Sequence, residues 1–189
     1  ASLNLIKFRR DDGSFDVERF RTAVRLFIIA QEILVDHASY PTAPICTNSH
    51  RFRPLGLGYA NLGSLLMSLG LPYAAGEGRA LAGAITAVMT GAAYEASAEL
   101  AAALGPFEAF ADNRDPMLNV MAMHRAAVDA IAADLCPAPL LSAAADAWDR
   151  AIAAGREHGY RNAQVSVLAP TGTIGFMMDC DTTGVEPDI

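Results

Sequence analysis

The sequence predicts a mainly α-helical fold with a few short β-strands. Apolar residues recur at helical spacing over most of the chain. Hydrophobic residues make up 52% of the 189 residues, and alanine is abundant, which favours closely packed helices. Only three short runs, at residues 2–8, 54–58 and 164–168, have the apolar or β-branched character of strands.

The first quarter of the chain is predicted as a strand followed by two helices. Residues 2–8 alternate loosely between apolar and polar side chains, as a strand does. Asp16 can cap the following helix, which we expect over residues 17–35 because apolar side chains recur there every three or four positions. Two prolines then interrupt the chain before a short helix at residues 43–50.

The middle of the chain combines a buried strand with two helices. Residues 54–58 are apolar and rich in glycine, which predicts a short strand with close backbone neighbours. A helix near residues 59–69 is expected to follow. Residues 76–104 should form one long helix, lined with small side chains and ended by Gly105.

The last third begins with a proline-initiated helix. Asp115 precedes Pro116, which we place at the first helical position. Another helix is predicted over residues 140–157, and a closing strand over residues 164–168. The spacing of glycine residues around Gly56 does not match a dinucleotide fingerprint, because Asn61 stands where its last glycine belongs.

The segment after the closing strand is the candidate anion site. Residues 169–174 read Ala-Pro-Thr-Gly-Thr-Ile, a tight turn with two hydroxyls and a glycine. Backbone N–H groups and Thr hydroxyls can converge on a phosphate at such a turn, above all where a helix begins. From chemistry alone an ordinary strand-to-loop connection is the stronger interpretation, and the segment lacks the glycine spacing and Lys-Ser/Thr ending of a P-loop.

Several long motifs resemble the large catalytic chain of ribonucleotide reductases. They are ASLNLIKF (1–8), RPLGLGYANLGSLLMSLG (53–70), LGPFEAFADNRDPML (104–118), HGYRNAQVSVLAPTG (158–172) and APTGTIGFMMDCDTTGVEPD (169–188). The portion MMDCDTTG is most similar to the adenosylcobalamin-dependent class II enzymes. The motifs occur in the family's order and span nearly the whole chain.

The resemblance implies an internal piece of a larger enzyme. Residues 1–189 would form a single partial domain, a fragment of the family's ten-stranded α/β barrel. The full enzyme would convert ribonucleotides, as diphosphates, to 2′-deoxyribonucleotides by a thiyl-radical mechanism started by adenosylcobalamin. The radical cysteine and the redox cysteines belong to segments outside this chain. We therefore expect no catalytic residue here, no cobalamin bound by this piece and no turnover by it alone.

The resemblance also assigns candidate site residues. The matching loop of the family holds the substrate diphosphate, which implicates Ala169, Pro170, Thr171, Gly172, Thr173 and Ile174. The glycine-rich stretch and the tail motif would line the active site through Gly56, Gly58, Tyr59, Asn61 and Cys180.

The composition of the chain and the spacing of its cysteines indicate which metals, nucleic acids, membranes and proteins it can bind. Cys46, Cys136 and Cys180 lack metal-ligand spacing, so no metal site is predicted, and reduced thiols favour a cytoplasmic location. A net charge of −7 argues against direct DNA or RNA binding. No apolar run is long enough for a membrane span. The hydrophobic content predicts a homo-oligomer, or self-association through exposed apolar surface.

Two other interpretations remain open at this point. One is a fragment of a di-iron-dependent class I reductase, whose loop region is similar. The other is a non-catalytic helical binding or scaffold module that keeps the same core. The natural length of the protein would distinguish them.

Overall fold

A computed structural model describes residues 1–188 and confirms the mainly helical fold. The strands are β1 (Ser2–Asn4) and β2 (Gly58–Ala60), and a short 3-10 helix, η1, spans Leu5–Phe8. The helices are α1 (Val17–His37), α2 (Ala43–Phe52), α3 (Leu62–Ser68), α4 (Gly76–Leu104), α5 (Phe110–Val128), α6 (Ala138–His158) and α7 (Gly172–Met177).

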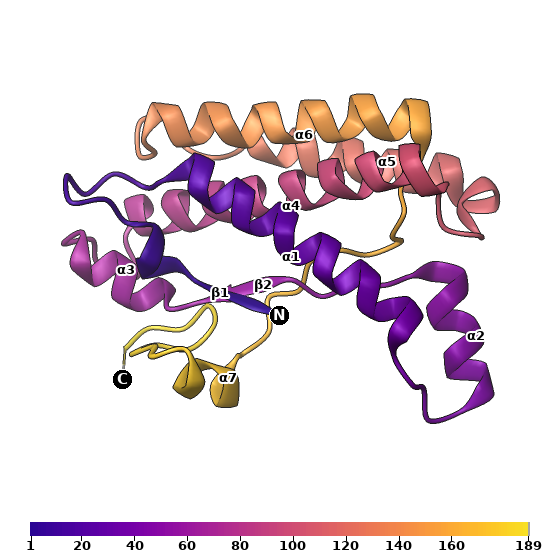
Figure 1. Cartoon of the computed structure of the whole chain (residues 1–189). Coiled ribbons are helices and arrows are strands. Elements are labelled where there is room, and N and C mark those ends of the chain that lie inside the picture. Colours follow the sequence, from indigo (N-terminus) through magenta and orange to yellow (C-terminus); the bar gives the residue numbers. More distant parts are fainter. Residues whose placement is uncertain (189) are drawn as a thin grey trace.

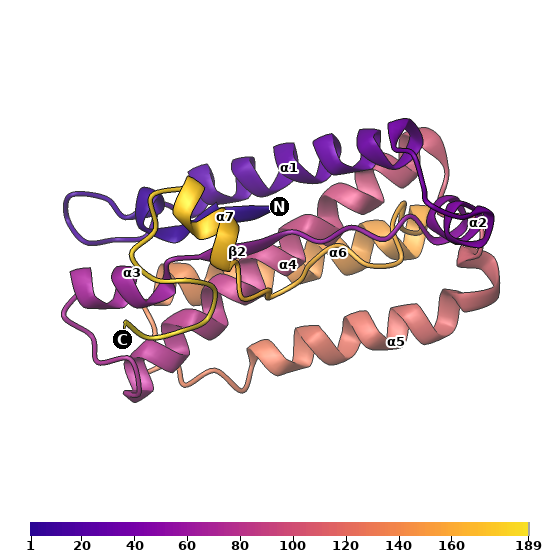
Figure 2. The same ribbon diagram turned by 90° about the horizontal axis from the view of Figure 1, so that it is seen from below.

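The long helices form a layer on one side of the two strands (Figure 1). Helix α4 lies at its centre and packs against α6 and α1, while α5 packs against α6. Helix α7 and the C-terminal segment lie on the other side of the strands, as the second view shows (Figure 2). The strands thus separate a helical layer from the segment that contains the candidate phosphate loop.

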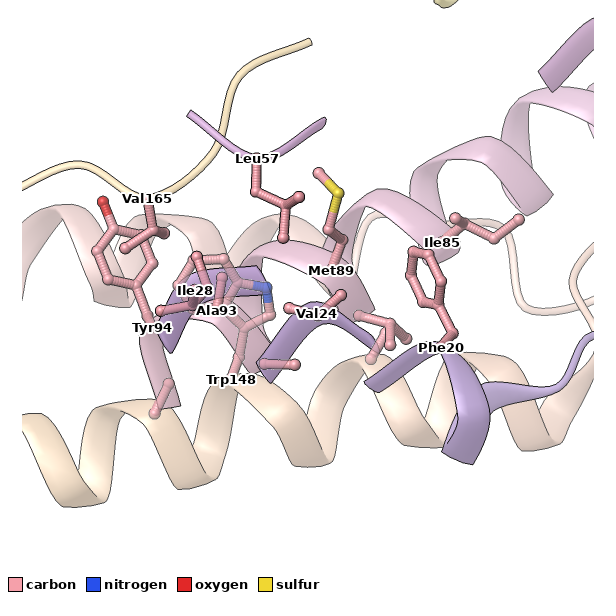
Figure 3. Packing of buried hydrophobic residues seen from close by; sticks show 14 of the residues in the cluster. Phe20, Val24, Ile28, Leu57, Ile85, Met89, Ala93, Tyr94, Trp148 and Val165 are labelled. Carbon is pink, nitrogen blue, oxygen red and sulfur yellow. The ribbon is translucent and has the colours of Figure 1, made fainter. Parts of the chain in front are cut away.

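The core lies between the strands and the helical layer. Leu57 and Val165, on the strand side, are fully buried and point towards the helices (Figure 3). Phe20, Met89 and Trp148 contribute from α1, α4 and α6. Burial of large apolar side chains from both sides fixes the strands against the helices.

The strands pair in parallel, with Ser2 opposite Gly58 and Asn4 opposite Ala60. An isolated parallel bridge joins Leu57 to Ser166 and continues the sheet on its other side. The pairing leaves no room for a side chain at Gly58, because a Cβ there would lie 2.1 Å from the carbonyl oxygen of Val167. Glycine is therefore required where the backbones meet.

The predicted strands are displaced or shortened in the structure. The first strand ends at Asn4 because residues 5–8 turn into η1. The second lies at Gly58–Ala60 rather than 54–58, so the next helix begins at Leu62 and not at residue 59. Residues 164–168 form only the bridge at Ser166, which pairs with Leu57.

Two helix boundaries also correct the sequence interpretation. Pro116 lies inside α5, which begins at Phe110, and not at its first position. Phe110 is buried against Phe107 and Tyr160, and this packing extends the helix past the proline. By contrast, α4 has the predicted bounds, and the side chain of Asp16 caps α1 by accepting from the backbone N–H of Arg19.

Candidate functional site

The candidate phosphate loop leaves the sheet after Ser166 and turns sharply at Thr171. Thr171 adopts a left-handed backbone conformation, with φ of 58°, although a β-branched side chain disfavours it. Helix α7 begins at the next residue, and the N–H of Gly175 donates to the carbonyl oxygen of Thr171 at 2.8 Å. The loop is therefore a strand-to-helix turn, as the sequence suggested.

The loop offers backbone donors to solvent. The N–H groups of Gly172, Thr173 and Ile174 precede the first intrahelical bond of α7 and so have no partner within that helix. Gly172 and Thr173 are exposed, and no described atom lies within 4 Å of where a Cβ on Gly172 would stand.

The two threonine hydroxyls differ in their surroundings. The Thr171 side chain is nearly buried, and its hydroxyl donates to the carbonyl oxygen of Pro170 at 2.7 Å. Thr173 is exposed. The structure thus leaves the side chain of Thr173, rather than that of Thr171, exposed to solvent.

Ala169 and Pro170 rest against the tail segment. The N–H of Gly184 donates to the carbonyl oxygen of Pro170 at 2.8 Å. A Cβ on Gly184 would lie 2.3 Å from the carbonyl oxygen of Ala169, so only glycine permits this approach. The tail therefore forms a close backbone support behind the loop.

Gly56 and Gly58 lie in the ladder that carries the loop. The N–H of Gly56 donates to the side-chain oxygen of Gln31 at 3.2 Å, and the N–H of Gly58 donates to the carbonyl oxygen of Ala1 at 2.9 Å. Both donors are engaged within the fold. In this structure the two glycines serve backbone packing.

Tyr59 belongs to the helical core. Its side chain is 1% exposed, and its hydroxyl lies 2.8 Å from the Thr86 hydroxyl on α4. Burial raises the pKa of the Tyr59 phenol, so the group stays protonated at neutral pH. Tyr59 therefore faces away from the candidate loop.

Asn61 lies between the N-terminal strand and the tail. It is fully buried and adopts a left-handed conformation with φ of 71°. Its side-chain amide donates to Asn4 at 3.0 Å, and its side-chain oxygen accepts the N–H of Thr182 at 3.0 Å. Sequence reasoning missed Asn4 and Thr182, although the tail motif that contains Thr182 was its strongest family signal.

Cys180 lies half-buried in the turn after α7. Burial raises the pKa of its thiol, the carboxylates of Asp181 and Asp179 raise it further, and Lys7 opposes them. The thiol is therefore protonated at neutral pH. All three cysteines are free.

No further ligand chemistry stands out within residues 1–188. No group of three or more His, Cys, Asp or Glu side chains in that range is arranged to hold a metal ion. None of the helices in the described part of the chain combines the length and apolar character that crossing a bilayer requires.

Comparison with known proteins gives a match over the whole chain. Residues 1–189 match the family model described as "Ribonucleotide reductase, barrel domain". Three similar proteins share the name vitamin B12-dependent ribonucleotide reductase. They come from Rhodopirellula baltica (60% identical over 189 residues), Streptomyces avermitilis (52% over 194) and Agrobacterium fabrum (50% over 204). Each alignment covers all of this chain but only 18%, 20% and 16% of the respective relative.

Proposed function

Because this chain belongs to the ribonucleotide reductase barrel-domain family, we propose that it is part of an enzyme that reduces ribonucleotides to 2′-deoxyribonucleotides. The chain spans at most a fifth of the length of the three relatives. The activity is therefore proposed for a larger protein, to which this piece contributes substrate positioning. The radical and redox cysteines would belong to other segments.

Adenosylcobalamin is the cofactor proposed for the full enzyme. The three relatives are vitamin B12-dependent by name, which favours this class over the di-iron alternative. A cavity of about 780 Å³ is lined mainly by apolar side chains such as Leu69, Leu81 and Leu140, and no histidine is among its described lining residues. This apolar lining does not fit a corrin ring with its polar side chains, and we assign no step of the reaction through the cofactor to this chain.

The role proposed for residues 169–174 is to hold the substrate diphosphate. The observation that supports this role is the cluster of open donors: the N–H groups at the start of α7 and the exposed Thr173 hydroxyl. Left-handed Thr171 turns the chain so that these donors follow one another around a single bend. Radical chemistry requires an accurately held ribose, and anchoring the diphosphate supplies much of that accuracy.

The experiment is the Thr173→Val substitution in the full-length reductase that contains this chain. Valine keeps the shape of threonine and removes one hydroxyl donor. Loss of a hydrogen bond to a charged phosphate should cost about 1.5–3 kcal/mol, or roughly a ten- to hundredfold fall in kcat/KM for the ribonucleotide.

Two further variants serve as controls for the Thr173→Val result. Thr173→Ser retains the hydroxyl and should retain most of kcat/KM. Thr22→Val makes the same exchange on exposed α1, where the hydroxyl donates to the carbonyl oxygen of Glu18, and should leave kinetics unchanged. Unchanged KM and rate for Thr173→Val would contradict Thr173 as a ligand.

A cytoplasmic location is part of the same proposal. All three cysteines are free, as expected of a protein kept in a reducing compartment.

A further inference from the structure

We infer that Asn61 is a positioning residue for the phosphate loop, acting through Thr182 and Gly184. This inference rests on the function proposed for residues 169–174, and it gives a role to a buried side chain that contacts the tail at Thr182. Asn61 would not touch the substrate. It would fix the tail segment against which the loop is built.

Every polar group of Asn61 has a partner. Its backbone N–H donates to the carbonyl oxygen of Thr183 at 3.2 Å, and its carbonyl oxygen accepts from Leu65 at 3.1 Å. Its side-chain oxygen accepts both the N–H and the hydroxyl of Thr182, at 3.0 and 3.3 Å. Its side-chain amide donates to Asn4 at 3.0 Å. Both polar atoms of this fully buried side chain are hydrogen-bonded, which holds it in one orientation.

Two further hydrogen bonds, made by Asn4 and Thr182, hold the tail to β1 and α3. The side-chain amide of Asn4 donates to the carbonyl oxygen of Met178 at 3.1 Å, just after α7. The hydroxyl of Thr182 accepts the N–H of Ser64 at 3.3 Å. Residues 178–183 are therefore anchored to β1 and to the start of α3 by buried or half-buried hydrogen bonds.

The anchored tail reaches the loop at Gly184. Its N–H donates to the carbonyl oxygen of Pro170, directly before Thr171. Gly184 also packs directly on Ala169, because a Cβ at Gly184 would lie 2.3 Å from the carbonyl oxygen of Ala169. A hydrogen-bonded path thus runs from Asn61 through residues 182–184 to the bend of the loop.

The loop needs such support because of Thr171. The left-handed region disfavours a β-branched residue, and this conformation persists only where the surroundings enforce it. Once the anchor at Thr182 is removed, Thr171 is free to relax and the donors at the start of α7 no longer face one point. Phosphate binding then weakens because the free loop must be ordered at the moment of binding.

The test uses the full-length reductase and the substitution Asn61→Gly. Glycine tolerates the left-handed backbone, so the variant removes the side-chain contacts without adding strain. We expect KM for the ribonucleoside diphosphate to rise about tenfold, equivalent to the loss of about 1.4 kcal/mol of binding, with a smaller change in kcat. A second readout compares the Kd of the ribonucleoside diphosphate with that of the corresponding nucleoside, which lacks phosphate. The loss should fall on the diphosphate.

Thr182 provides an independent pair of variants. Thr182→Val removes the hydroxyl that joins Asn61 to Ser64 and should raise KM in the same direction, whereas Thr182→Ser should restore it. Asn162→Ala is the matched control, because it removes another fully buried amide, whose partners are Glu32, the carbonyl oxygen of Arg53 and the hydroxyl of Ser97 rather than residues of the tail. It should lower Tm and leave KM near the wild-type value.

The outcomes separate this inference from the proposal on which it rests. Equal loss of nucleoside and diphosphate binding, an unchanged KM for Asn61→Gly, or an equal rise of KM in Asn162→Ala would overturn the role of Asn61. If the unsubstituted enzyme binds the diphosphate no more tightly than the nucleoside, the phosphate-binding function itself fails, and the inference fails with it.

Discussion

Glu32 is a buried carboxylate that joins three distant parts of the chain. It is 4% exposed and accepts from Arg53 at 2.5 Å, from Arg161 at 2.7 Å and from the Asn162 amide at 2.6 Å. Burial acts to lower the pKa of Arg53, but its hydrogen bonds to Asp36 and Glu32 outweigh burial and raise it. The network fixes the entry to β2 beside the segment that leads to Val165.

We predict that Glu32→Gln destabilises the chain strongly. Glutamine keeps the shape but leaves the Arg53 and Arg161 charges without their shared carboxylate, which typically costs about 3–5 kcal/mol at a buried site. Urea denaturation measures the free energy of unfolding. Glu99→Gln, which breaks the exposed pair with Arg25, should cost no more than about 1 kcal/mol. Equal losses for both variants would contradict the special weight given to Glu32.

Single residues show where sequence reasoning ends. The order of residues 169–174 and their family motif were enough to locate the candidate loop. The left-handed conformation of Thr171, and the partners of Asn61, depend on segments that are distant in sequence. Only the fold brings Asn61 to Thr182, so spacing along the chain could not reveal the contact.

At the level of elements, the end of α6 is held by Tyr160, whose side chain packs against the last turns of that helix. The ring is fully buried, and its hydroxyl donates to the carbonyl oxygen of Ala151 at 3.0 Å. A Cβ added at Gly155 would lie 2.1 Å from this ring. The absence of a side chain at Gly155 thus leaves room for the Tyr160 ring. The same ring packs edge to face against Tyr94 of α4.

We predict that Gly155→Ala destabilises the chain although alanine is the better helix former. Displacing a buried ring typically costs about 1–3 kcal/mol or more, against a gain of up to about 1 kcal/mol in helix propensity. Gly83→Ala in α4 is the matched control, because its Cβ would stand 3.6 Å from Ile131, an ordinary contact. Thermal unfolding should show a lower Tm for Gly155→Ala and an equal or higher one for Gly83→Ala. The reverse order would refute the packing argument.

Helices were more predictable than strands for a physical reason. Helical hydrogen bonds are local, so the apolar repeat, together with local signals such as Asp16 and Gly105, predicted the bounds of α4 and nearly those of α1 and α6. A strand is defined by its neighbours, and residues 164–168 therefore appear as a single bridge rather than a strand. The prediction that α5 begins at Pro116 was wrong, because packing of the buried Phe110 extends the helix to residue 110.

On the scale of the whole molecule, α1 carries an apolar face that the described chain leaves uncovered. It lies across the front of the helical layer (Figure 1). Leu26, Phe27, Ile33 and Leu34 are between 41% and 61% exposed, while Phe20 and Ile28 on the other face are fully buried. A contiguous exposed patch of this kind usually marks a contact with another surface.

We predict that the chain self-associates through this face. Light scattering should give a mass above that of the monomer, and the double substitution Leu26→Lys and Leu34→Lys should lower it towards the monomer. Met123→Lys is the control, because Met123 is at least as exposed, at 70%, but lies on α5, which packs against α6. A monodisperse monomer before any substitution would contradict the prediction.

The parallel sheet has a consequence for the growing polypeptide. Leu57 exchanges hydrogen bonds with Val165 and Val167, which leave the ribosome more than a hundred positions later. Helices α1 and α4 can form as they emerge. Until residues 165–167 have been synthesised, however, one edge of β2 stays unpaired, and an unpaired strand edge can pair with a strand of another molecule. The loop at Thr171 follows directly after the segment that closes this edge. A nascent chain therefore passes through a period when it is open to wrong pairing and has not yet formed the loop proposed to bind the diphosphate.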